Sequence, residues 1–171
     1  TQTKYIIEAM LNTGKYSFEG YGDDDTRSKY WKPKDQNFTD LKFRKKINKT
    51  SIELKTSFFN EELIDLGNEN FFPLLGTAND LHYFTFRNVN FLKINTEDSL
   101  YNWNFTGSYS KTNFEKKQFE VDLNTGLDFQ TSNPDYNTFD QFKSLFNRFE
   151  YNRFSGLRYK SQLGLDFVYE I

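Results

Sequence analysis

Strict alternation of apolar and polar side chains is the feature that most constrains the fold of this chain. From Leu100 to Lys111, aromatic residues and a glycine occupy one parity, and Asn, Thr and Ser occupy the other. The segments 119–130 and 157–169 repeat this pattern. Because successive side chains of a β-strand point to opposite faces, the alternation predicts three long strands with one apolar and one polar face each.

The remainder of the chain is compatible with more strands of the same kind. Alternating residues at 41–47 and 52–58 predict a hairpin that turns at Asn48-Lys49. A β-rich run at 81–94 and apolar residues at 145–151 predict further strands, and weaker patterns predict strands at 4–11 and 15–21. We therefore predict an all-β fold of roughly eight to ten strands, closed into an antiparallel up-and-down barrel that leaves no free edge.

We expect one domain, 1–171, interrupted by loops. These loops are predicted near 20–37, 60–80 and 131–139, because Gly, Pro, Asn and Asp gather there. The loop at 60–80 has room for one short helical turn around 61–66 before Gly67 and Pro73 end it.

Composition excludes several classes of protein. Aromatic residues make up 19% of a chain whose mean hydropathy is −0.81, and disordered proteins are poor in aromatics. No apolar run approaches the ~20 residues of a membrane-spanning helix. The 22 basic and 24 acidic residues nearly balance, so we expect no nucleic-acid partner. The basic stretch 42–49 is interpreted as a solvated strand or hairpin rim, and the absence of cysteine removes thiolate chemistry.

Residues with catalytic or metal-binding potential are few. His82 is the single histidine, and we assign it a packing or lumen role. Ser99 and Ser108 belong to no nucleophile motif, and the acidic run 23–25 lacks the spacing of a calcium loop, so it is interpreted as a solvated loop. We therefore predict a protein that is not an enzyme and that carries no metal or cofactor.

Alternation alone leaves open which face of a barrel is apolar. An outer-membrane barrel turns its apolar parity toward lipid, whereas a lipocalin-like barrel turns it inward. Three features favour the membrane form. The strands have 12 or more residues, the aromatic Phe119 and Phe129 lie on either side of aliphatic residues, and the polar parity carries charges of both signs. The predicted lipid-facing residues are Tyr101, Trp103, Phe105, Tyr109, Phe119, Val121, Leu123, Leu127, Phe129, Leu163, Leu165, Phe167 and Tyr169. The predicted polar lumen residues are Glu120, Asp122, Asp128, Arg158 and Lys160.

The end of the chain carries a resemblance to a known class of proteins. Gln162, Gly164, Phe167 and Tyr169 resemble the C-terminal insertion signal of bacterial outer-membrane barrels, although Glu170 and Ile171 stand where that signal has an aromatic residue. The run 149–169 is also similar to the end of the salt-stress-induced outer-membrane barrel family. The resemblance implies a Gram-negative outer-membrane protein with a structural, adaptor or narrow-pore role. Its partners would be membrane lipid and other envelope proteins.

The alternative is a soluble, periplasmic or secreted protein. A β-barrel or β-sandwich with an aromatic face would bind a small apolar ligand, a sugar or a peptide. It would dissolve without detergent, which separates it from the membrane hypothesis.

Overall fold

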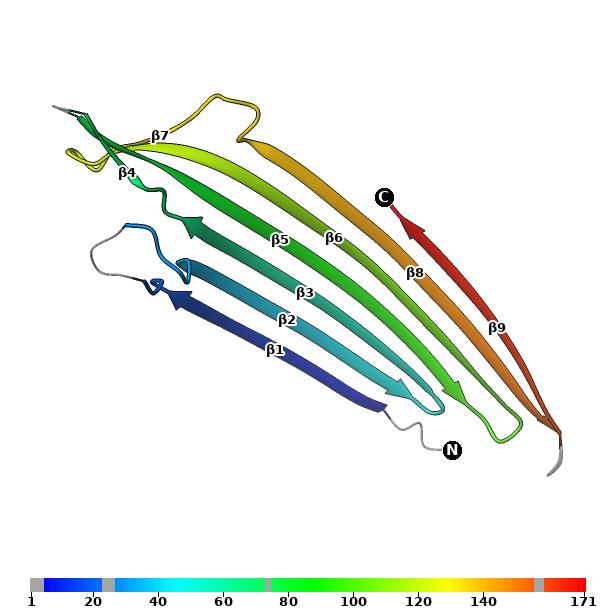
Figure 1. The fold of residues 1–171 in the computed structure, drawn as a ribbon. Helices are drawn as coiled ribbons and strands as arrows, with labels where there is room; N and C mark the ends of the chain where they lie inside the picture. The colour runs from blue at the N-terminus through cyan, green and yellow to red at the C-terminus, as the bar shows by residue number, and fades with distance from the viewer. Residues whose placement is uncertain (1–4, 23–26, 73–74, 156–158) are drawn as a thin grey trace.

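A computed structural model describes residues 5–22, 27–72, 75–155 and 159–171. Over these ranges the chain forms one antiparallel sheet, drawn in Figure 1. The strands are β1 (Tyr5–Phe18), β2 (Lys34–Ile47), β3 (Thr50–Asp65), β4 (Glu69–Phe72), β5 (Leu75–Glu97), β6 (Tyr101–Asp122), β7 (Asp128–Gln130), β8 (Thr138–Ser155) and β9 (Tyr159–Glu170). Seven of them lie side by side in the order β1-β2-β3-β5-β6-β8-β9, while the short β4 pairs with β5 and β7 pairs with β6.

Short turns gather at one end of the sheet and long connections at the other (Figure 1). The predicted hairpin at Asn48-Lys49 is confirmed: Ile47 pairs with Thr50, and Asn48 has a φ of 53°. Asparagine tolerates this left-handed conformation, which a tight hairpin turn requires. At the same end, the carboxylate of Asp98 accepts a hydrogen bond of 2.6 Å from the Ser99 backbone N–H and shapes the turn between β5 and β6.

All three predicted loops differ from the structure. The loop and helical turn predicted at 60–80 are wrong, because β3 continues to Asp65 and a β4–β5 hairpin follows it. Pairing with β5 along the whole of β3 outweighs the local loop signals. The loop at 20–37 is shorter than predicted, because β2 begins at Lys34. The loop at 131–139 is also shorter than predicted, because β8 begins at Thr138.

The segment 119–130 is not one strand. Strand β6 ends at Asp122, whose carboxylate accepts hydrogen bonds of 2.8 and 3.3 Å from the backbone N–H groups of Asn124 and Thr125. Such side-chain bonds to the following backbone close a turn, and Gly126, with a φ of 72°, completes it. The residues on either side of this turn therefore do not continue one alternating pattern.

The sheet is open. Strands β1 and β9 form its two edges and each has one neighbour, so a closed barrel is not confirmed. Every neighbouring pair along the seven-strand path is antiparallel, so β1 and β9 run in the same direction. In Figure 1 both arrowheads point toward the end of the sheet that carries the long connections, although β9 stops partway along β8.

The sheet is a single layer without a hydrophobic core of its own. Ala78 is the only fully buried apolar side chain among the described residues, and no large side chain there is completely buried. Large apolar residues such as Leu54 (47% exposed) and Leu165 (63% exposed) stand open to the surroundings. A sheet is stable only when at least one face packs against another apolar layer or an apolar medium.

Candidate lipid-facing surface

The strand register assigns every side chain to one of two faces. Residues directly opposite each other on neighbouring strands point to the same face, so the pairing can be followed across all seven long strands. We call the face that carries Phe105 face A, and the face that carries Thr106 face B.

Face A carries an apolar band in the half of the sheet nearest the short turns. It consists of four successive rows that cross all seven strands. These rows are Tyr5, Ile47, Thr50, Thr96, Trp103, Tyr151 and Leu163; Ile7, Lys45, Ile52, Ile94, Phe105, Phe149 and Leu165; Ala9, Phe43, Leu54, Leu92, Gly107, Asn147 and Phe167; and Leu11, Leu41, Thr56, Asn90, Tyr109, Leu145 and Tyr169. Lys45 is the only charged side chain in them.

Tyrosine and tryptophan lie only in the two outer rows of this band. Tyr5, Trp103 and Tyr151 belong to the row nearest the short turns, and Tyr109 and Tyr169 belong to the opposite outer row. The two inner rows contain aliphatic residues and phenylalanine instead. Amphipathic rings at both borders of an apolar band are the arrangement found where hydrocarbon meets water.

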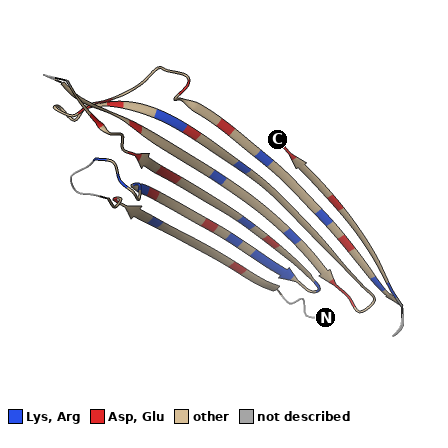
Figure 2. Cartoon of the chain, in the orientation of Figure 1, with Lys and Arg blue, Asp and Glu red and all other residues tan. Residues whose placement is uncertain are grey.

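Face B carries one row of charged residues at the same level of the sheet. Between the two inner rows of the band, one row on face B consists of Glu8, Arg44, Glu53, Lys93, Thr106, Arg148 and Asp166. We call it the charge row. Its sign alternates from β1 to β5, and Thr106 is its only uncharged member. Figure 2 shows acidic and basic positions on each of these strands.

Ion pairs connect the charges of face B. Arg148 donates two hydrogen bonds, of 2.8 and 2.9 Å, to the carboxylate of Asp166 on β9. Lys42 Nζ lies 3.2 Å from Glu53 Oε1, and Arg44 lies 3.8 Å from Glu8. These ion pairs balance opposite charges on neighbouring strands. The charged groups remain partly exposed, so face B requires contact with water.

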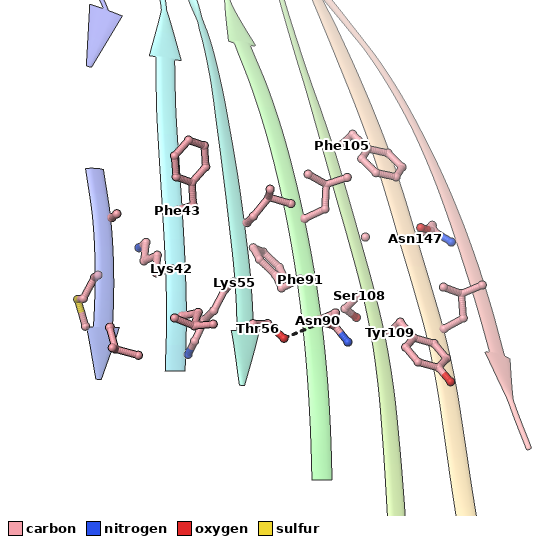
Figure 3. A pocket seen from close by; sticks show the side chains of 18 residues that line it. Lys42, Phe43, Lys55, Thr56, Asn90, Phe91, Phe105, Ser108, Tyr109 and Asn147 are labelled. Atoms are coloured by element: carbon pink, nitrogen blue, oxygen red, sulfur yellow. Dashed lines mark hydrogen bonds between the residues drawn. The ribbon is translucent and has the colours of Figure 1, made fainter. Parts of the chain in front are cut away.

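A broad hollow of about 800 Å³ lies over the middle of the apolar band. Its wall includes Phe43 from β2, Phe105 and Tyr109 from β6, and Asn90 from β5, whose side-chain oxygen accepts a 2.7 Å hydrogen bond from Thr56 (Figure 3). One layer lines it from one side only. Small-ligand sites instead bury most of the ligand surface, so the hollow suits a covering layer or a fluid apolar medium better than a single small molecule.

At the far end of the sheet, beside the long connections, charged side chains form close ion pairs, and we call this the polar end. Asp80 is 4% exposed there, and its carboxylate accepts two hydrogen bonds from the Arg27 guanidinium and one of 3.0 Å from the Gly67 backbone N–H. Lys32 forms an ion pair with Asp65 close by. These contacts attach the β1–β2 connection to β3 and β5.

His82 packs in this polar end and does not meet a serine. Its Nδ1 lies 2.9 Å from Glu62 Oε1, and its ring centroid lies 4.6 Å from that of Phe119. Ser108 points to face B, whereas His82 points to face A, and Ser99 lies in the turn at the opposite end of β5. The structure therefore assembles no Ser-His pair from these residues.

The structure brings together most of the predicted apolar residues. Those on β6 from Tyr101 to Tyr109 and those on β9 from Leu163 to Tyr169 share face A. Phe119 and Val121 share that face as well, but they lie far from the band, beside the long connections. Leu123 and Leu127 lie in the turn after β6. Phe129 is paired with Glu120 and so points to face B, and the predicted bracketing of one strand by Phe119 and Phe129 is wrong.

The predicted polar residues are divided. Glu120 and Asp122 lie on face B of β6, and Lys160 lies on the same face of β9. Asp128 is paired with Val121, which places it on face A. Arg158 and the acidic run 23–25 lie outside the described residues. Within the described part of the chain, no three histidine or acidic side chains gather into a metal site.

Sequence reasoning missed the residues that five of the seven strands contribute to the band, and it assigned no lumen role to the members of the charge row. Phe43, Leu54 and Ile94 alternate with polar residues as clearly as the C-terminal segments do. Their strands were predicted, but only the register reveals that they lie level with Phe105.

Comparisons with protein-family models, with curated proteins and with solved structures found no match. In the described ranges, no helix is long and apolar enough to cross a membrane.

Proposed function

We propose that this chain forms part of the wall of a β-barrel in a bacterial outer membrane. Face A lies against lipid, and face B lines the polar interior. One observation carries this proposal. At one level of the sheet, four rows of face A contain a single charged residue, while the charge row of face B, between the two inner rows, is charged at every position except Thr106. A wall between hydrocarbon and water requires this division.

The dimensions of the band support the proposal. The four rows and one flanking position at each end correspond to Asn102–Ser110 of β6, and a tilted transmembrane strand needs about 9–11 residues. The band stops there although β6 continues to Asp122. Apolar character thus follows a level of the sheet and not the length of the strands, as expected from a medium of fixed thickness.

The connections support the same orientation. Outer-membrane barrels have short periplasmic turns and longer extracellular loops. Here the short turns border the apolar band, and the connections β1–β2, β3–β5 and β6–β8 lie at the far end. We therefore assign the short turns to the periplasmic side and the polar end, with Asp80 and His82, to the cell exterior.

Closure of the barrel requires strands besides these seven. Because β1 and β9 run in the same direction, an odd number of further strands must separate them in a wall that is antiparallel throughout. An envelope protein partner or another part of one polypeptide would supply them. One further strand would give an eight-stranded barrel whose interior is filled by side chains, whereas three or more would enclose a wider interior. A structural or pore-wall role follows, without catalysis.

The soluble alternative requires a second protein layer over face A. Such a layer would explain the apolar band, but it gives no reason for Tyr and Trp to be confined to its two borders. The alternative therefore explains fewer of the observations.

Quenching of Trp103 by brominated lipids tests the proposal. The full-length protein carrying Trp31→Phe is isolated from membranes and placed in phosphatidylcholine bilayers brominated at shallow or deep acyl positions. We expect strong quenching by the shallow label and weaker quenching by the deep one, because Trp103 lies in an outer row of the band. A matched Trp103→Phe protein reports Trp31, which is 69% exposed in the β1–β2 connection and should not be quenched. No quenching of Trp103, in a protein that is monodisperse without detergent, would establish the soluble alternative.

A further inference from the structure

We propose that Lys111 and Lys143 form a binding site for the phosphate of an anionic lipid headgroup. This inference rests on the proposed function, because it places the two lysines where the headgroups of the lipid covering the apolar band would lie. The site takes a phosphate monoanion or dianion attached to a lipid, held between two ammonium groups.

The two lysines are direct cross-strand partners at the outer border of the band. Lys111 on β6 is in register with Lys143 on β8, and the next pair toward the band is Tyr109 with Leu145. Side chains that face each other in this way have Cβ atoms about 4.5–5.5 Å apart, and like charges so placed destabilise a sheet. The pair therefore gains stability if an anion lies between the two ammonium groups.

Among the described residues, no acidic side chain lies beside the two lysines on face A. Face A carries no acidic side chain from the row of Tyr5 to the row of Lys15, which lies one row beyond Lys111. The first acidic residue on β6 beyond this level is Glu115, and its Oε1 already lies 3.0 Å from Lys117 Nζ. A polar neighbour on face A of β6 is Asn113, whose side-chain oxygen accepts a 3.0 Å hydrogen bond from Gln141. That bond leaves the Asn113 amide N–H groups as further donors to an anion.

A second pair of facing lysines shows the contrast within the same sheet. Lys42 on β2 is in register with Lys55 on β3, but on face B. Each has an acid beside it: Lys42 lies 3.2 Å from Glu53, and Lys55 lies 3.7 Å from Asp40. Where facing lysines meet water, the chain provides the counter-charge. Where they meet the border of the apolar band, it does not.

Lipid headgroups provide that missing charge at this level. Basic side chains at a membrane surface attract anionic lipids, and the attraction adds with each lysine. Long lysine stems can also lie along the apolar band while their ammonium groups reach the headgroups. For two lysines we expect about a thirty-fold gain in affinity over a zwitterionic lipid.

Lipid titration in neutral detergent tests the site. Phosphatidylglycerol and, separately, phosphatidylcholine are added to the full-length protein, and bound lipids are counted by native mass spectrometry. We expect Lys111→Gln/Lys143→Gln to weaken phosphatidylglycerol binding about thirty-fold and to leave phosphatidylcholine binding unchanged. The matched control, Lys42→Gln/Lys55→Gln, removes the same charge from face B and should bind phosphatidylglycerol like the unaltered protein.

Several outcomes would overturn the site. Equal weakening by both double variants would indicate general charge attraction, and no weakening by the first would show that lipid phosphate does not use these lysines. Displacement of phosphatidylglycerol by millimolar inorganic phosphate would assign the pair to the free anion instead. If the lysine variants do not weaken lipid binding but Trp103 is quenched as expected, the lipid-phosphate site is wrong and the barrel proposal stands. If Trp103 is not quenched, both proposals are wrong.

Discussion

Replacing Ile94 with arginine places a guanidinium in the middle of the apolar band. Ile94 lies on face A in an inner row, between Ile52 of β3 and Phe105 of β6. None of these neighbours offers a hydrogen-bond partner. In a membrane barrel, arginine at the bilayer midplane costs about 2–4 kcal/mol, falling to about 0–1 kcal/mol near the interfaces.

The same substitution at two nearby positions gives the expected profile. Thr96 belongs to the outer row of face A, two residues and about 7 Å along the strand from Ile94, so Thr96→Arg should cost about 0–1 kcal/mol. Asn95, the next residue in sequence after Ile94, points to face B beside Asn104. Asn95→Arg should change stability by no more than about 0.5 kcal/mol, because that face meets water.

Reversible urea unfolding of the full-length protein in phosphatidylcholine vesicles measures these differences through tryptophan fluorescence. The decisive quantity is the difference in unfolding free energy between Ile94→Arg and Asn95→Arg, since the two variants add the same group one residue apart. Equal costs at both positions, or a cost at Thr96 as large as at Ile94, would refute the assignment of face A to lipid.

Two further predictions concern the ends of the sheet. Asp80→Ala removes the acceptor of the Arg27 guanidinium and leaves that cation half-buried. We therefore expect urea titration to show a loss of about 3–5 kcal/mol in unfolding free energy. A loss below about 1 kcal/mol would contradict this prediction. At the other end, a 2.7 Å hydrogen bond from Lys49 is the largest cause that lowers the pKa of Asp98 in the β5–β6 turn. A lowered folded-state pKa means that this carboxylate adds stability above its ordinary pKa, and that the contribution disappears as the pH falls through the folded-state value. Lys49→Met should raise the pKa of Asp98 toward its ordinary value in an NMR titration, and an unchanged pKa would show that the bond is absent in solution.

The sequence determined the class of fold because side-chain alternation is a local property of a strand. Segments such as 101–109 and 163–169 could be assigned without knowledge of their neighbours, and their faces agree with the observed register. The hairpin at Asn48 was equally readable, since the turn depends on two residues and on the strands beside them.

Local signals failed where long-range pairing or side-chain capping decided the outcome. The segment 60–65 contains no strong strand pattern, yet it continues β3 because β5 offers hydrogen-bond partners along its full length. The segment 119–130 alternates well, yet Asp122 binds the following backbone and turns the chain, which moves Phe129 to the opposite face from Phe119. The period-two pattern of the sequence does not show that the chain turns and that the face changes.

The apolar band and the charge row were decided by tertiary structure alone. Each strand contributes only a few residues to either, and the sequence does not say how far one strand is shifted against the next. The register aligns Ile52, Ile94 and Phe105 in one row, and with it sets the opposing charges of Glu53 and Lys93 on the other face. The sequence thus determined that each strand has two unlike faces, whereas the hydrogen-bonded register decided at which level of the sheet those faces become an apolar surface and a charged one.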